Sequence, residues 1–327
     1  MMIDPAWPGV AFAAGMVLVA AQTAHAQAAD VAAKAAPAKA APAKEASVAA
    51  SQPARSQADA ATIPPGPAAA TMNVAGVALP VFTYRPAHCT PATLLVVFHG
   101  VQRDGAAYRD HAMPLAERIC AIVVAPQFDA ARFPRNVYQY GGASAAHGLS
   151  RDPRQPRALV APLIDWARRA SRIAAPRVVL LGHSAGAQFL DRVAAYGGVP
   201  GVARIVIANP STWVMPSVTD AAPFGFGGLG PAHAGDDALR AYLAQPVTVL
   251  LGTDDTGGRH LVHGSEADGQ GANRYARGLN AFRAARAVAA QRGWTFNWRL
   301  VEAPGIGHDA ARLFASPAAR RAVQDDR

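Results

Sequence analysis

A serine flanked by small residues lies where a reactive turn would need it. Residues 178–186 read Val-Val-Leu-Leu-Gly-His-Ser-Ala-Gly, so Ser184 occupies a Gly-x-Ser-x-Gly motif. An apolar, strand-like run precedes the motif and a helical pattern follows it, and small flanking residues let a tight strand-to-helix turn close. Such a turn exposes the hydroxyl, while the helix N-terminus behind it favours negative charge. Ser184 is therefore a candidate nucleophile, although the short motif alone could occur by chance in a Gly- and Ala-rich chain.

The elements that must position this serine are short apolar runs alternating with amphipathic stretches. Residues 72–77 and 79–84 predict an opening antiparallel hairpin. Further strands are expected at 93–98, 121–125, 177–182, 203–208, 247–252 and 296–303. All of these except the last are continuous Val-, Leu- and Ile-rich runs, which is typical of strands buried on both faces of a parallel sheet. The last run is more mixed, which predicts an edge strand.

Helical patterns lie between the strands. Apolar residues recur at helical spacing in three stretches, which include Leu159, Leu163 and Trp166, then Phe189, Val193 and Tyr196, then Tyr275, Leu279 and Phe282. Strands that alternate with helices predict an α/β fold with a doubly wound, mostly parallel sheet and helices on both faces. Such sheets place their chemistry at the carboxyl ends of the strands, where Ser184 also lies.

The motif in this setting resembles the α/β-hydrolase superfamily over residues 72–320. Within it, the chain is most similar to exported poly(3-hydroxybutyrate)-depolymerase-like serine esterases, whose Gly-x-Ser-x-Gly turn and His-Gly loop are matched at 182–186 and 99–100. The resemblance implies an α/β-hydrolase sheet, an acyl-transfer reaction, and catalytic residues in the chain order serine, acid, histidine.

A general base is needed because a serine hydroxyl is a poor nucleophile until an imidazole takes its proton. The histidines after Ser184 are His233, His260, His263 and His308. His308 follows the last predicted strand through Pro304-Gly305-Ile306-Gly307, which places it on a loop at that strand's carboxyl end. His308 is the predicted base, and the alternative is a histidine on a surface loop.

The carboxylate that orients this base is expected after the strand at 247–252. Asp254 and Asp255 both follow that strand, so the spacing leaves two candidates. The resembling enzymes have Gly-x-x-Asp at this position, which selects Asp255. Asp254 would then cap the loop, because aspartate side chains readily bond backbone amides in turns.

An oxyanion hole needs two backbone amides. One belongs to the residue after the nucleophile, here Ala185. The resemblance places the second on the loop Phe98-His99-Gly100-Val101-Gln102, where we assign it to Val101, with Gln102 as the alternative. His99 is expected to hold this loop by hydrogen bonds rather than to react.

Two aromatic-rich insertions follow strands at the same edge of the sheet. Residues 127–148 and 210–230 can line a substrate pocket or simply cover the sheet, and the sequence leaves both readings open. Trp213 lies soon after a strand end and is the predicted substrate contact.

The two cysteines predict a disulfide. Cys89 precedes the strand at 93–98 and Cys120 precedes the strand at 121–125, so parallel neighbours would bring both to the amino-terminal edge of the sheet. A pair of cysteines in an exported protein is more often bridged than free. The alternative is two buried thiols.

The start of the chain predicts export. Residues 10–21 are apolar and uncharged, and Ala24-His25-Ala26 fits a signal-peptidase site, although Asp4 replaces the usual basic residues. We expect a signal peptide at 1–26, an Ala/Pro/Lys-rich disordered linker at 27–71 and the catalytic domain at 72–327. The predicted location is secreted or periplasmic, with no stable membrane insertion, because an apolar run of this length is too short to span a bilayer.

Composition argues against several other classes. The formal charge is +9, but all three lysines lie in the linker and no basic run with interleaved aromatics occurs, so no nucleic-acid partner is predicted. The chain has no HExxH and no P-loop motif, so no metal and no cofactor is expected.

The predicted function is hydrolysis of a small or polymeric carboxylic ester through an acyl-enzyme. A peptidase or an acyltransferase on the same fold is the alternative, because a Ser-His-acid triad does not select the leaving group. A non-catalytic binding protein is a third reading. It is disfavoured because neither the serine, the acid nor the histidine is missing. The sequence does not indicate an oligomeric state.

Overall fold

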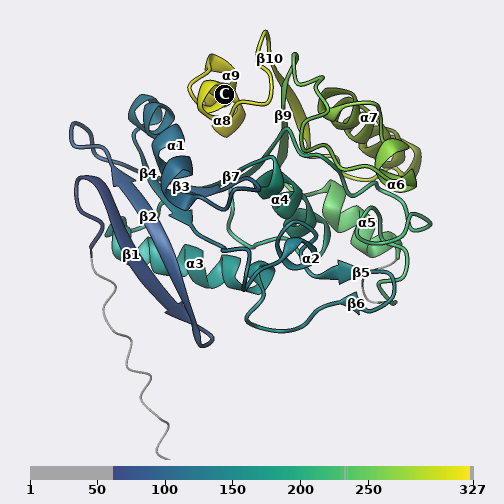
Figure 1. Cartoon of the computed structure of the whole chain (residues 1–327), viewed down its shortest axis with the longest axis horizontal. Helices are drawn as coiled ribbons and strands as arrows, with labels where there is room; N and C mark the ends of the chain where they lie inside the picture. Colours follow the sequence, from purple (N-terminus) through teal and green to yellow (C-terminus); the bar gives the residue numbers. More distant parts are fainter. Residues whose placement is uncertain (1–61, 232, 234, 325–327) are drawn as a thin grey trace, which may run out of the picture. The chain divides into compact units, whose positions relative to one another are not determined.

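The computed structural model describes residues 62–231, 233 and 235–324. The expected signal peptide and most of the expected linker lie outside these residues. The main sheet of the described part has eight strands in the order β1-β2-β4-β3-β7-β8-β9-β10 (Figure 1). Their bounds are β1 Gly66–Val74, β2 Val77–Arg85, β3 Thr93–Phe98, β4 Ala121–Pro126, β7 Arg177–His183, β8 Arg204–Ala208, β9 Val247–Gly252 and β10 Arg299–Ala303. A separate two-stranded sheet pairs β5 (Ala143–Ser144) with β6 (Gly148–Leu149).

The sheet is parallel from β4 to β10, and the opening hairpin β1–β2 joins it antiparallel to β4. The long helices are α1 (Gly105–Ile119), α3 (Pro156–Ser171), α4 (Ala185–Ala195) and α7 (Arg274–Arg292). Shorter helices are α2 (Arg135–Tyr138), α5 (Asp236–Leu243), α6 (Ser265–Asp268), α8 (Ala310–Phe314) and α9 (Pro317–Val323). The predicted doubly wound α/β fold is confirmed.

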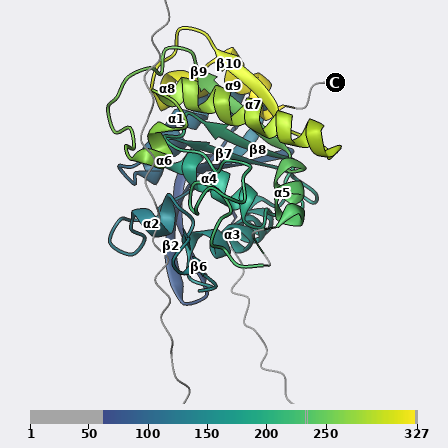
Figure 2. The same cartoon turned by 90° about the vertical axis from the view of Figure 1, so that its right-hand side faces the viewer.

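Alternation along the strands creates two separate cores. Side chains of successive strand residues point to opposite faces. In β3, Leu94 and Val96 join the core formed with α3, α4, α5 and α7, whereas Leu95 and Val97 join the core formed with α1, α8 and α9. Figure 2 shows the long α7 (yellow-green) beside β9 and β10. Helices therefore cover both faces, and the carboxyl ends of the parallel strands open at one edge.

The hairpin begins earlier than the sequence predicts. β1 spans Gly66–Val74 instead of 72–77, and Ile63 just before it is buried, so ordered structure starts ahead of the expected position 72. The turn is Ala75-Gly76, with positive φ of 50° and 74°. Positive φ at both central residues characterises a type I′ hairpin turn. The start of the strand lies ahead of the predicted one because its Ala-rich sequence carries no apolar pattern, and pairing with β2 determines its conformation.

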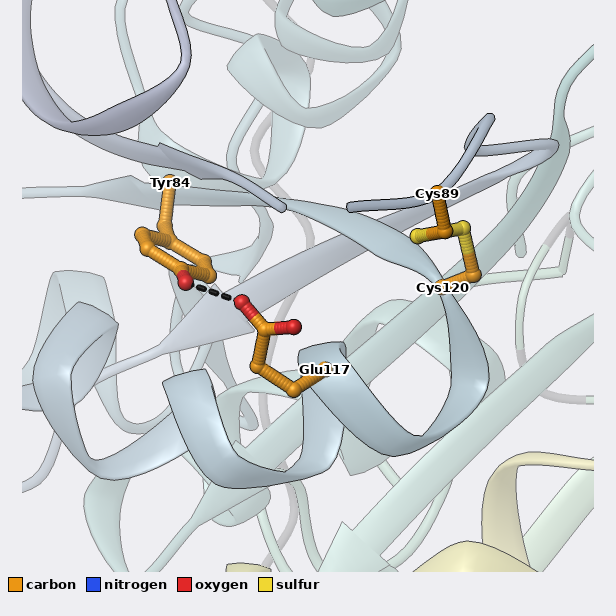
Figure 3. Close-up of a disulfide and its surroundings, with 4 residues drawn as sticks. All are labelled: Tyr84, Cys89, Glu117 and Cys120. Atoms are coloured by element: carbon orange, nitrogen blue, oxygen red, sulfur yellow. Dashed lines mark hydrogen bonds between the residues drawn. A yellow bond between two sulfur atoms is a disulfide. The ribbon is translucent and has the colours of Figure 1, made fainter. Parts of the chain in front are cut away.

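The disulfide lies at the amino-terminal edge of the sheet. Cys89 and Cys120 are bridged (Figure 3), with Cα atoms 6.1 Å apart. Just after them in the chain, Thr93 pairs in register with Ala121. A hydrogen bond from the Tyr84 hydroxyl to Glu117 lies nearby and also joins β2 to α1. The predicted bridge is present in the structure.

Candidate active site

The turn at Ser184 is as tight as its sequence suggests. Ser184 has φ 56°, a left-handed conformation that is rare for a residue with a side chain. A Cβ on Gly186 would lie 2.2 Å from the carbonyl oxygen of Phe98, and one on Gly182 would lie 2.3 Å from the carbonyl oxygen of Gly186. Both motif glycines are therefore needed for close backbone contact between β3, β7 and the start of α4.

Ser184, His308 and Asp255 form a continuous hydrogen-bonded row. The Nε2 atom of His308 lies 3.0 Å from the Ser184 hydroxyl, and its Nδ1 lies 2.6 Å from Oδ2 of Asp255. Asp255 is almost fully buried, whereas the His308 side chain keeps about a quarter of its surface exposed. Such a row can take a proton from the serine and hold the resulting imidazolium against a carboxylate.

Asp254 lies in a different environment. It is exposed, and its Oδ1 accepts a hydrogen bond of 3.0 Å from the Thr253 hydroxyl. Its side chain forms no hydrogen bond with His308 in the described part of the chain. Of the two carboxylates, the structure therefore places that of Asp255, and not that of Asp254, against His308.

The loops that carry the acid and the histidine are joined through their backbones. The Asp254 amide donates to the Ile306 carbonyl (3.1 Å), the Thr253 amide to the Ala303 carbonyl (3.1 Å), and the Gly305 amide to the Thr253 hydroxyl (2.9 Å). These bonds fix the loop after β9 against the loop after β10. Asp255 and His308 therefore meet although 53 positions separate them in the chain.

A buried arginine lies behind the acid. Arg274, the first residue of α7, places Nη1 3.4 Å from Oδ1 of Asp255 and donates from Nη2 to the Arg259 carbonyl (2.7 Å). The side chains of Arg274 and Asp255 are each 1% exposed, and burial lowers the pKa of Arg274. The pair compensates the buried carboxylate charge. Sequence reasoning missed Arg274, which lies inside a helical pattern with no distinguishing motif.

Amides for an oxyanion are available beside the serine. Gly100, Val101 and Gln102 line the cavity at Ser184, and no protein group in the described residues accepts from the amides of Val101 or Ala185. Gln102 lines the same cavity, so its amide remains the alternative to that of Val101 as the second hydrogen-bond donor to the oxyanion.

His99 fixes the loop that carries these amides. Its Nε2 accepts from the Phe128 amide (2.9 Å), its Nδ1 contacts the Gly100 carbonyl (3.1 Å), and its own carbonyl accepts from the Tyr138 hydroxyl (2.9 Å). Burial lowers the pKa of His99 to about 4, so the ring is neutral with the proton on Nδ1. The structural role expected for His99 agrees with these contacts.

Tyr108 and His183 form a second buried contact at the serine. The Tyr108 hydroxyl lies 3.1 Å from Nδ1 of His183 and also hydrogen-bonds the backbone of Gly100. The His183 ring centroid lies 4.6 Å from that of His308, and burial together with nearby cations lowers the pKa of His183 well below its usual range. Tyr108 therefore joins the serine turn to the loop of Gly100, a contact between distant elements that no sequence pattern signals.

Several polar side chains line the cavity over Ser184. Its volume is about 380 Å³, and His111, Arg259 and His260 line it together with Ser184 and His308. Within the described residues, no group of three or more His, Cys, Asp or Glu side chains is arranged to hold a metal ion.

The predicted contact of Trp213 with substrate is not seen. Trp213 is fully buried and does not line the cavity at Ser184. Its backbone amide and carbonyl are both bonded to the side chain of Gln270, at 2.8 and 2.9 Å. These bonds hold the residue below the surface.

A buried ionic network holds the rest of the 210–230 insertion against α4. Asp191 accepts from the Val214 amide and the Tyr242 hydroxyl, both at 2.6 Å, and Arg192 donates to the Thr212 carbonyl (2.8 Å). Burial raises the pKa of Asp191 to about 6. In the other insertion, Phe128, Phe133 and Tyr138 are buried beside Phe98 and Phe189. These aromatic side chains therefore cover the sheet.

Two solved structures resemble the chain over most of its length. The poly(3-hydroxybutyrate) depolymerase LpqC from Bordetella parapertussis is 34% identical, with 78% of this chain and 89% of that chain covered and a TM-score of 0.71. Poly(aspartic acid) hydrolase-1 from Sphingomonas sp. KT-1 is 31% identical, with 80% and 99% covered and a TM-score of 0.70. No family model and no curated protein matches the chain. The sheet order, the serine turn and these two relatives together show that the chain belongs to the α/β-hydrolase superfamily. Within the superfamily, it resembles the poly(3-hydroxybutyrate)-depolymerase-like serine esterases.

Proposed function

We propose that the protein hydrolyses carboxylic esters through an acyl-enzyme formed on Ser184. The observation that carries the proposal is the hydrogen-bonded row from the Ser184 hydroxyl through His308 to the buried carboxylate of Asp255, with distances of 3.0 and 2.6 Å. These distances lie within the range that proton transfer in such a row requires. The likeness to a depolymerase whose name specifies an ester polymer adds support.

In the proposed reaction, Nε2 of His308 takes the hydroxyl proton as Oγ of Ser184 bonds to the ester carbonyl carbon. The amides of Val101 and Ala185 hold the negative oxygen of the tetrahedral intermediate. His308 then gives its proton to the leaving alkoxide, and the alcohol departs. Water attacks the acyl-enzyme in the same way, His308 takes its proton, and the proton returns to Ser184 as the acid is released. Asp255 keeps the second imidazole proton on Nδ1 throughout.

Amide hydrolysis is the second candidate, because poly(aspartic acid) hydrolase-1 is named for a polymer whose units are joined by amides. The two activities share every step up to the leaving group. An amine is a poorer leaving group than an alcohol, so amide cleavage demands full protonation by His308 before departure. An acyltransferase would differ only in the acceptor that replaces water.

An oxidising compartment is proposed for the protein, either outside the cell or in a periplasm. The support is the Cys89–Cys120 disulfide, since such bonds persist mainly in exported proteins. Among the described helices, none has the length and apolar character needed to span a membrane.

The test compares an ester and an amide of the same acyl group, p-nitrophenyl butyrate and butyryl p-nitroanilide, in the wild type and in Ser184→Ala. We expect the wild type to cleave the ester much faster than the anilide. Ser184→Ala should lower ester turnover by about 10⁴ to 10⁶, the loss typical of removing a triad serine. Faster cleavage of the anilide would favour the amidase, and near-normal ester turnover by Ser184→Ala would refute both. A p-nitrophenyl series from acetate to palmitate, run beside a polyester film, separates small from polymeric substrates.

A further inference from the structure

A second cavity adjoins the one at Ser184. It has a volume of about 360 Å³ and shares two lining residues with the first, Val101 and His260. Because these two residues line both cavities, they form the rim between them. A ligand longer than one unit can therefore occupy both by crossing this rim.

Val101 places the rim beside the reacting centre. Its side chain is 40% exposed, one of two large hydrophobic side chains with such exposure in the described residues. Its amide is the proposed oxyanion donor, so a carbonyl held there lies at Ser184. The next unit of the same ligand would then pass over the Val101 side chain into the second cavity, which adds apolar contact at the crossing.

The second cavity combines apolar walls with positive charge. Leu261 and Val262 provide the apolar surface, and Arg135 provides a cation beside the imidazole rings of His260 and His263. No aspartate or glutamate is among the described residues that line it. His263 does contact a carboxylate outside the lining, because its Nδ1 lies 3.1 Å from Oδ1 of Asp268.

Arg135 is the cation best placed to bind an anion. It is exposed, and its guanidinium lies 5.3 Å from the centre of the Tyr140 ring. In the described chain it forms no ion pair with a carboxylate, whereas the neighbouring Arg132 is paired with Asp129 at 2.6 Å. An arginine held by an aromatic face and without an acidic partner presents its planar donors to an incoming carboxylate.

We propose that the second cavity, the Arg135 subsite, binds the substrate unit next to the cleaved bond and that Arg135 binds a carboxylate on that unit. The inference deepens the proposed function, since it assigns the substrate as a carboxylate-bearing oligomer. The carboxylate can be the free end of a short oligoester of hydroxy acids or a side chain of an acidic polymer. Both sources present the same anion to the guanidinium.

The kinetic test uses the dimer of 3-hydroxybutyrate as the free acid and as its methyl ester. The free acid carries its carboxylate on the unit next to the internal ester bond, and the methyl ester removes that charge with little change in shape. For hydrolysis of the internal bond, the wild type should show kcat/KM about tenfold higher for the acid, the order expected of one charge-assisted contact. Arg135→Gln should bring this ratio close to unity.

Arg286→Gln is the matched control, because Arg286 is also an exposed arginine over an aromatic ring, 5.9 Å from Phe282, and does not line either cavity. It should leave the ratio unchanged. Equal rates for the acid and the methyl ester in the wild type, together with equal binding in the assay below, would overturn the subsite.

A binding measurement separates this inference from the proposed function. Titration calorimetry on Ser184→Ala, with and without Arg135→Gln, uses the acid dimer, its methyl ester and an aspartic acid tetramer. Binding of either anionic ligand that Arg135→Gln weakens about tenfold supports the subsite, and the ligand that binds identifies the carboxylate source. Binding of neither anion, or binding unaffected by Arg135→Gln, overturns it. Rapid ester cleavage by Ser184→Ala would instead refute the proposed function alone.

Discussion

Asp254 and Asp255 are neighbours in the chain, and the structure gives them different surroundings. Asp255 is buried between His308 and Arg274, and Asp254 is exposed beside Thr253. The Asp255 amide donates to the Gly252 carbonyl (3.1 Å) and closes a turn over Thr253 and Asp254, and of the two carboxylates only that of Asp255 reaches the histidine. The spacing of the sequence alone could not choose between them.

Asp255→Asn should lower kcat by about 10⁴, because an amide in this place no longer holds the imidazole in the tautomer that accepts the serine proton. Asp254→Asn should keep kcat within a few-fold and cost at most about 1 kcal/mol of unfolding free energy, the worth of one turn hydrogen bond. Steady-state kinetics and urea unfolding of both variants measure the difference. If Asp254→Asn lost activity and Asp255→Asn kept it, the two roles would have to be exchanged.

The elements themselves were predictable where burial imposes a pattern. The bounds of β3 and β9 agree with the apolar runs at 93–98 and 247–252, because strands buried on both faces are made mostly of apolar residues. β10 is an edge strand as expected, although it begins at Arg299 rather than 296. β1 was placed too late because its alanines are neutral in pattern and its pairing with β2 is non-local.

In the candidate site, too, residues marked by a local pattern were predictable and residues placed by distant contacts were not. Ser184 and His308 could be proposed from a motif and from a loop after a strand. Tyr108 and Arg274 could not, because each acts through a contact between loops or helices far apart in the chain. Trp213 failed as a substrate contact because its burial depends on Gln270, 57 positions away.

Neutral His99 hydrogen-bonds the loop after β3 to the loop after β4, through the Gly100 carbonyl and the Phe128 amide. The pKa of His99 is lowered from 6.5 to about 4, so the unfolded chain binds more protons than the folded chain between these pH values. The contribution of neutral His99 to the free energy of unfolding is therefore complete above pH 6.5 and is lost as the pH falls towards 4. A depression of this size corresponds to roughly 3 kcal/mol across that window.

His99→Gln should have a flatter pH dependence of unfolding free energy than the wild type between pH 6.5 and 4. Glutamine can accept from the Phe128 amide but does not titrate in this range. Urea unfolding at several pH values measures both slopes, and His183, whose pKa is also lowered, is present in both proteins and cancels from the comparison. Parallel slopes would mean that His99 does not carry this acid sensitivity.

Across the whole folded unit, the disulfide and the candidate active site lie at opposite edges of the sheet. The bridge precedes β3 and β4, and Ser184 follows β7 at its carboxyl end. Removal of the disulfide should therefore lower the unfolding free energy without changing the ester kinetics. The bridge spans a sequence separation of 31 residues and restricts the unfolded chain.

The double variant Cys89→Ser/Cys120→Ser should lose about 3–4 kcal/mol of unfolding free energy, the entropic value for a loop of this length. Its ester kinetics at a temperature where it remains folded should match the wild type. Chemical unfolding of the oxidised protein, the reduced protein and the variant measures the first effect. An unchanged midpoint in the variant and after reduction would show that the bridge does not stabilise the fold.

Covalent capture of the nucleophile tests the central claim most directly. A fluorophosphonate forms a stable adduct with a serine only where a base removes the hydroxyl proton, so it reports the activated state of Ser184. Intact mass spectrometry should show one adduct per chain, with inactivation in proportion, and peptide mapping should place it on Ser184. Ser184→Ala should remain unlabelled. Labelling of a different residue that abolishes activity, or an active enzyme with no label on Ser184, would contradict the account.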